Sequence, residues 1–81
     1  MMIDINIKEI LEKDFDAYYG TKEIIEKESG IYAGTDEDGN NVIVLREKGH
    51  GFTTITKARN GWYECCCYNE DGFCEEITFE K

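Results

Sequence analysis

The sequence contains no proline, a single histidine, and no apolar run near the roughly 18 residues that a membrane-spanning helix requires. Its first residues, Met1-Met2-Ile3-Asp4, lack the basic and apolar regions of a secretory signal peptide. Without proline, nothing in the chain forces a break in a strand. We therefore expect a cytoplasmic protein with reduced cysteines and no membrane partner.

Basic residues are scarce as well. Nine Lys and Arg stand against eighteen Asp and Glu, which gives a formal net charge of -9 on 81 residues. The hydrophobic fraction of 41% is too large for a disordered acidic tail, so we expect one folded domain over residues 1–81. A chain this acidic repels phosphate groups, and direct binding to nucleic acid is therefore not expected.

The charge is unevenly distributed along the chain. Residues 42–61 carry one acidic and four basic residues, whereas residues 1–20, 21–41 and 62–81 are each net acidic. The four basic residues are Arg46, Lys48, Lys57 and Arg59. Any positive patch is therefore small and lies against a negative background.

Two acidic segments form the candidate partner-binding surface. Carboxylates two positions apart on a strand are roughly 6.5 Å apart, of the order of successive phosphates along a nucleic-acid strand. A basic nucleic-acid channel would attract such an array by electrostatic steering. The selected residues are Glu64, Glu70, Asp71, Glu75 and Glu76 near the C-terminus, and Asp36, Glu37 and Asp38 in an earlier turn. The simpler interpretation is a solvated face that keeps a small protein soluble.

Apolar spacing predicts a helix over residues 1–20. Five residues recur at intervals of three and four and form one stripe: Ile7, Ile10, Leu11, Phe15 and Tyr18. Residues 21–30 fit either a short helix that begins at Thr21 or a strand that turns at Ser29-Gly30, and we favour the helix.

From residue 31 onward the pattern predicts an antiparallel sheet. Runs rich in β-branched and aromatic residues occupy 31–35, 42–46, 52–58, 62–68 and 73–79, with glycine-containing turns between them. The predicted fold class is α+β, with an N-terminal helix packed on an antiparallel β-meander of about five strands over residues 31–81.

The Asn60-Gly61 pair predicts a two-residue type I′ turn, because both central positions of that turn need positive φ. Such a turn places Ile55 opposite Cys66 on the neighbouring strand. A four-residue loop at residues 69–72 would then place Tyr68 opposite Phe73. With both loops, the residues that share the face covered by the helix are Ile55, Trp62, Tyr68, Phe73, Ile77 and Phe79.

Four cysteines are the other unusual feature. Cys65, Cys67 and Cys74 with His50 suggest a zinc site, but Cys66 cannot join them because adjacent strand residues point to opposite faces. The favoured interpretation is reduced cysteine that packs as a small hydrophobic residue. A Cys67–Cys74 disulfide and a thiol-dependent enzyme are further alternatives. We assign no metal, no cofactor and no catalytic residue.

Several turn motifs resemble those of small proteins encoded by phages and mobile elements of Gram-positive bacteria. The closing hairpin carries this resemblance through Asn60-Gly61-Trp62-Tyr63, Tyr68, Asp71-Gly72 and Glu75-Glu76. The chain is also similar in character to anti-CRISPR proteins that mimic DNA, and Asp38-Gly39-Asn40 with Asn60-Gly61-Trp62 resembles one inhibitor of a Cas nuclease.

The resemblance implies a non-enzymatic, phage-type inhibitor of a host defence protein, with a Cas nuclease as one candidate. Its acidic surface would bind a basic nucleic-acid-binding surface in the host cytoplasm. The alternative is a small structural or zinc-binding domain that uses the C-terminal cysteines. A homodimer could form through the exposed edge at residues 31–35.

Overall fold

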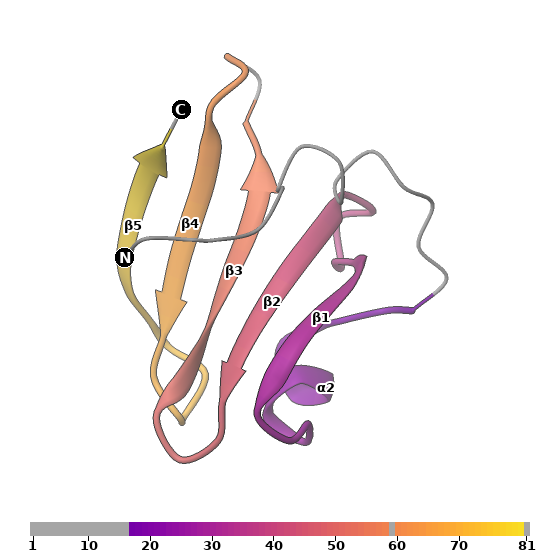
Figure 1. Ribbon diagram of the computed structural model, residues 1–81, viewed down its shortest axis with the longest axis vertical. Coiled ribbons are helices and arrows are strands. Elements are labelled where there is room, and N and C mark those ends of the chain that lie inside the picture. The colour runs from indigo at the N-terminus through magenta and orange to yellow at the C-terminus, as the bar shows by residue number, and fades with distance from the viewer. Residues whose placement is uncertain (1–16, 59, 81) are drawn as a thin grey trace.

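The computed structural model describes residues 17–58 and 60–80. In this part of the chain, five strands form one antiparallel sheet in the order β1-β2-β3-β4-β5, and one short helix lies against it (Figure 1). The elements are α2 (Thr21–Ile25), β1 (Gly30–Thr35), β2 (Asn41–Glu47), β3 (Gly51–Lys57), β4 (Tyr63–Tyr68) and β5 (Cys74–Glu80). The predicted five-strand meander is confirmed, and each strand lies within one residue of its predicted bounds.

The predicted N-terminal helix falls mostly outside the described residues, but its last four positions are described. Tyr18 forms a parallel bridge with Thr35, and the Tyr19 amide donates to the Thr35 carbonyl at 2.7 Å. Gly20 is extended and is the N-cap of α2. The helix prediction is therefore wrong for residues 17–20, because these residues pair with β1 instead. Within residues 17–58 and 60–80, no helix has the length and apolar composition of a membrane span.

Three of the four turns between strands share one geometry. At residues 36–40, 58–62 and 69–73, the amide of the first residue donates to the carbonyl of the fifth. The fourth residue is a glycine whose amide donates back to the first carbonyl. These glycines, Gly39, Gly61 and Gly72, have φ of 82°, 83° and 88°. Each loop is thus a three-residue connection with a glycine bulge, a common hairpin form.

The observed turn at residues 58–62 corrects the predicted register. The two-residue loop at Asn60-Gly61 is wrong, since the loop has three residues, and Ile55 therefore lies opposite Cys65 instead of Cys66. A slip of one residue moves a side chain to the other face of the sheet. Three side chains that were expected on the same face as Ile55 therefore lie on the other face of the sheet, namely Tyr68, Ile77 and Phe79.

Both faces of the sheet carry a buried core. The face against α2 buries Tyr19, Ile24, Val42, Val44 and Phe52, and the other face buries Ile43, Ile55 and Cys65. Strand β2 contributes to both cores, which explains why its sequence is a continuous apolar run and not an alternating one. Each fully buried aliphatic side chain in this strand contributes about 2 kcal/mol to folding.

Arg46 is the one charged side chain buried among the described residues, with 4% of its surface exposed. Its Nη1 and Nη2 atoms each donate to the Glu70 carboxylate at 2.8 Å. The guanidinium also donates to the carbonyls of Ile25 at 3.0 Å, Gly51 at 2.8 Å and Lys27 at 3.3 Å. One side chain therefore joins the end of α2, the start of β3 and the β4–β5 turn.

Glu70 completes this network from the other side. Its Oε1 atom accepts hydrogen bonds from the amides of Gly49 at 3.1 Å and Gly51 at 3.0 Å, in addition to the bond from Arg46. Charge-assisted hydrogen bonds of this kind, with a bidentate guanidinium and backbone amides as donors, are stronger than bonds between neutral groups. The β2–β3 and β4–β5 turns, which are adjacent at one end of the sheet, are consequently held together.

We expect Arg46→Met to lower the free energy of unfolding by about 3 kcal/mol, because it leaves the Glu70 carboxylate and several partly or fully buried carbonyls without the donor that Arg46 supplies. Lys48→Met is the matched control. Lys48 pairs with Glu28 at 2.6 Å, but both side chains are mostly exposed, so its loss should cost less than about 0.5 kcal/mol. Urea unfolding measures both values, and equal losses would contradict the central role of Arg46.

Candidate partner-binding surface

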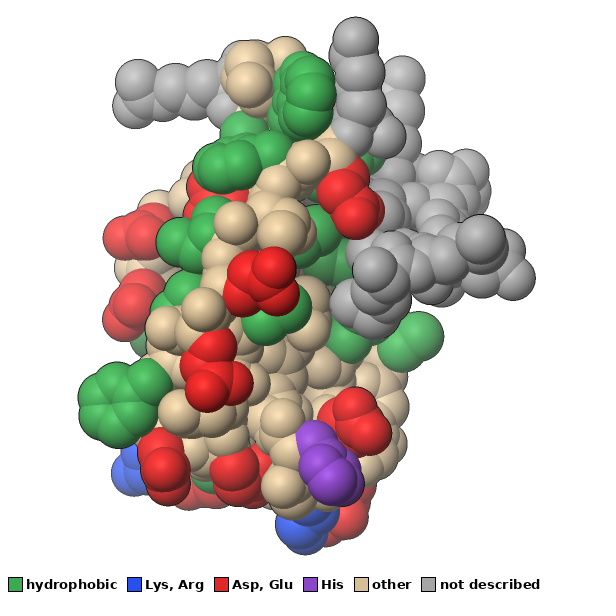
Figure 2. Space-filling model, turned by 90° about the vertical axis from the view of Figure 1, so that its left-hand side faces the viewer, with side chains coloured by type: hydrophobic (Ala, Val, Ile, Leu, Met, Phe, Trp, Pro, Cys, Tyr) green, Lys and Arg blue, Asp and Glu red, His purple; other side chains and the backbone are tan. Residues whose placement is uncertain are grey.

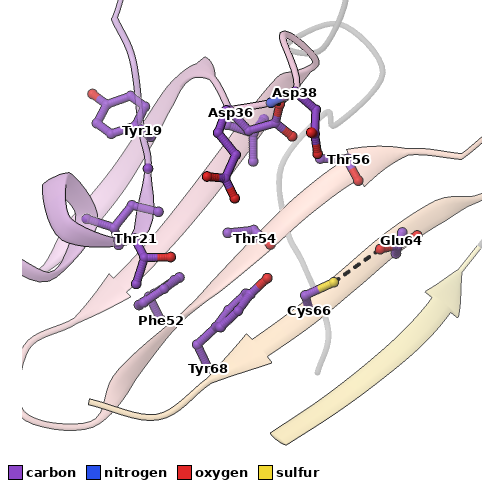
Figure 3. Close-up of a pocket in the computed structure, with 14 residues that line it drawn as sticks. Tyr19, Thr21, Asp36, Asp38, Phe52, Thr54, Thr56, Glu64, Cys66 and Tyr68 are labelled. Carbon is purple, nitrogen blue, oxygen red and sulfur yellow. Dashed lines mark hydrogen bonds between the residues drawn. The ribbon is translucent and has the colours of Figure 1, made fainter. Parts of the chain in front are cut away.

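Acidic residues from two separate elements surround one hollow beside α2. The cavity, of about 160 Å³, lies over the α2-covered face of β3 and β4 (Figure 3). Asp36, Glu37 and Asp38 reach it from the β1–β2 turn, and Glu64 reaches it from β4. The fold therefore brings together four of the eight acidic residues selected from the sequence, although they come from its two separate acidic segments.

Aromatic and small polar side chains form the floor of this hollow. Phe52 and Tyr68 stack with ring centroids 4.6 Å apart, and Thr54 and Thr56 lie along the same strand face. A floor with stacked aromatic rings and a negative rim is suited to a long basic side chain, whose methylene groups can rest on the rings while its charge meets the carboxylates.

Hydrogen bonds hold the rim in place. Asp36 Oδ1 accepts from the amides of Asp38 at 3.0 Å and Asn40 at 2.9 Å, which orders the turn. Glu64 Oε1 accepts from the Cys66 thiol at 3.2 Å. Burial, together with the bond to Glu64, raises the pKa of that thiol to about 12, so Cys66 stays protonated and donates to the carboxylate.

The acidic residues of the C-terminal hairpin do not form the single cluster that the sequence indicated. Glu64 lies near one end of β4, whereas Glu70 and Asp71 lie in the turn at the other end. Glu76 is opposite Cys67, and Glu75 is the extra residue of a bulge at the start of β5. The carboxylate of Glu70 is engaged by Arg46, so its main role is in the fold and not at a free surface.

The exposure of strand β5 on both faces is the feature that the sequence did not predict. All seven of its residues are exposed. Ile77 and Phe79, which were expected in the core, are 55% and 52% exposed, and Phe73 just before the strand is 70% exposed. The side of the molecule formed by β5 shows acidic side chains set among hydrophobic ones, with basic side chains only near one end (Figure 2). The alternating run Glu76-Ile77-Thr78-Phe79-Glu80 did not indicate this exposure, because alternation is typical of a half-buried strand.

The predicted basic segment does not form a positive patch in the described part of the chain. Arg46 is buried against Glu70, and Lys48 is paired with Glu28. Lys57 is exposed on β3, and Arg59 falls outside the described residues. Each pair joins one basic to one acidic side chain, so the pairs cancel charge locally and neither changes the net charge of the chain.

The four cysteines are divided between the two faces of the sheet. Cys65 and Cys67 share the face of Ile55, whereas Cys66 and Cys74 share the opposite face. The alternative of a Cys67–Cys74 disulfide is therefore wrong, and all four thiols are free. The alternative zinc set with His50 is not brought together either, and no group of three or more His, Cys, Asp or Glu side chains among residues 17–58 and 60–80 is placed to hold a metal ion.

Comparisons with known proteins found no protein-family model, no curated protein and no solved structure that matches the chain.

The stability of the protein should fall on acidification between pH 4.5 and pH 2. Hydrogen bonds from Arg46, together with those from the amides of Gly51 and Gly49, lower the pKa of Glu70 to about 2 from its ordinary value of 4.5. The unfolded chain then takes up this proton first, so the stabilisation is complete above about pH 4.5 and is lost as the pH falls toward 2. Urea unfolding as a function of pH measures it.

Glu70→Gln should weaken this acid dependence, because amide nitrogen and oxygen do not titrate. Glu75→Gln removes an exposed carboxylate from the same hairpin and is the control, with the wild-type dependence expected. The assignment fails if Glu70→Gln and the wild-type protein lose stability in parallel below pH 4.5.

Iodoacetamide at neutral pH should modify Cys74 first and leave Cys65 and Cys66 unmodified until the protein unfolds. Cys74 is exposed, whereas burial raises the pKa of the other two thiols and keeps them protonated. Mass spectrometry of the digested protein identifies the modified residue at each time. Fast labelling of Cys65 or Cys66 would instead favour a thiol-dependent enzyme.

Proposed function

We propose that this chain is a non-enzymatic, phage-type inhibitor that binds a host defence protein through its acidic surface. The observation that supports this most directly is the hollow rimmed by Asp36, Glu37, Asp38 and Glu64, on the same sheet face as the exposed Ile77 and Phe79 side chains of β5. This surface combines negative charge with accessible apolar groups, as a protein-binding site requires.

The negative charge of the chain indicates which kind of partner surface it would bind. The net charge of -9 creates a long-range negative field, and the buried Arg46 and paired Lys48 do little to offset it locally. Surfaces that bind nucleic acid carry the opposite field. The proposed partner is therefore a protein with a basic nucleic-acid-binding surface, such as a Cas nuclease, and the chain would occupy that surface in place of DNA.

The geometry of the hollow adds a specific contact. A Lys or Arg side chain that normally neutralises a phosphate would enter between the β1–β2 turn and β4, with Asp38 on one side and Glu64 on the other. The aromatic floor of Phe52 and Tyr68 would accept its methylene groups. Inhibition would follow by exclusion of nucleic acid and would require no chemical step.

The test is a binding assay with a purified Cas nuclease at increasing salt, with duplex DNA as a competitor. Asp38→Lys combined with Glu64→Lys should weaken binding by at least about tenfold, because two attractive contacts become repulsive. Glu26→Lys combined with Glu47→Lys is the matched control, since it changes the charge equally at exposed positions away from the hollow. Binding that is independent of salt and equal for both variants would contradict the proposal.

A further inference from the structure

Among residues 17–58 and 60–80, nothing pairs with the outer edge of β5. The strand pairs with β4 on one side, and every one of its residues is exposed. The other edge strand, β1, is different. At Thr35 its outer side forms backbone hydrogen bonds with Ala17 and Tyr19. Within the part of the chain that the structure describes, the outer edge of β5 thus presents unpaired backbone donors and acceptors, which are the usual template for the addition of another strand.

The two faces of β5 have different chemistry. Ile77 and Phe79 share the face of the hollow, since they lie opposite Cys66 and Glu64. Glu76, Thr78 and Glu80 lie on the other face, opposite Cys67, Cys65 and Tyr63. An added strand would place its side chains about 5 Å from these residues, so each face would select its own kind of neighbour.

We propose that the outer edge of β5 accepts an extended segment of the partner as a sixth strand, with the pattern basic, apolar, any residue, apolar, basic. The two basic residues would face Glu76 and Glu80, and the two apolar residues would face Ile77 and Phe79. The run Glu-Ile-Thr-Phe-Glu has the same pattern in both directions, so the segment fits in either orientation. This inference rests on the proposed function, because it names the segment of the basic partner that β5 would hold.

A second copy of the chain is a poorer occupant of this edge. Any regular antiparallel pairing of two β5 strands places Glu76 and Glu80 of both copies on one face, roughly 5 to 8 Å from each other. The two chains would also bring together two net charges of -9. Charge therefore disfavours self-association at β5 and favours a basic segment of another protein.

The experiment is an NMR titration of the full chain with a capped peptide that contains Lys-Val-Thr-Val-Lys. We expect shifts centred on β5, slower exchange of its outward amides, and an affinity of about millimolar, since the contact is small. A peptide with Lys-Pro-Thr-Pro-Lys keeps the charge but lacks two amide donors and cannot form a strand, so it should bind at least about tenfold more weakly.

Charge reversal supplies the second control. The Glu76→Lys, Glu80→Lys double variant should not bind the lysine peptide, because like charges then face each other. It should bind the corresponding Glu-Val-Thr-Val-Glu peptide instead. Equal binding of the proline peptide, shifts centred away from β5, or self-association through β5 in place of peptide binding would overturn the proposal. If the peptides fail while the salt-dependent assay with Asp38 and Glu64 succeeds, only strand addition is refuted. If that assay also fails, the proposed function is refuted as well.

Discussion

The bond between Arg46 and Glu70 is the interaction on which the rest of the structure depends. It joins two residues 24 positions apart, and the same guanidinium binds carbonyls at the end of α2 and at the start of β3. A sheet built only from hairpins has few connections between distant segments. Here one buried cation fixes the helix and two turns at a single end of the sheet.

The acidic residues at the hollow are separate from the Arg46 network. Arg46 is enclosed in the fold, whereas Asp36, Asp38 and Glu64 face a hollow beyond the reach of the Arg46 network. Helix α2 contacts β2 and β3, so it does not extend over Ile77 and Phe79 on β5. The acidic rim and the open apolar strand therefore have a common origin, which is a helix too short to cover the whole sheet.

Local patterns were enough to predict the strands and most of the turns. Glycine-containing turns and β-branched runs determine where strands begin and end, because these effects act within a few residues. The register was not predictable, since Asn60-Gly61 fits both a two-residue and a three-residue loop, and one residue of difference exchanges the faces. Residues 17–20 followed tertiary pairing with β1, which overrides helical spacing.

Part of the candidate site could be predicted from charge alone, whereas pairing between distant residues could not. Asp36, Asp38 and Glu64 were selected by charge, and the fold places them together. Glu70 was selected on the same ground but serves the fold, because pairing with a residue on another strand cannot be read from local sequence.

Native-state hydrogen exchange of the free protein tests most directly whether one buried network orders the sheet and leaves β5 open. The account predicts that the Gly51 amide, which donates to Glu70, exchanges as slowly as the amides of β2, while the outward amides of β5 exchange freely. Fast exchange at Gly51, or protection along the whole of β5, would contradict it.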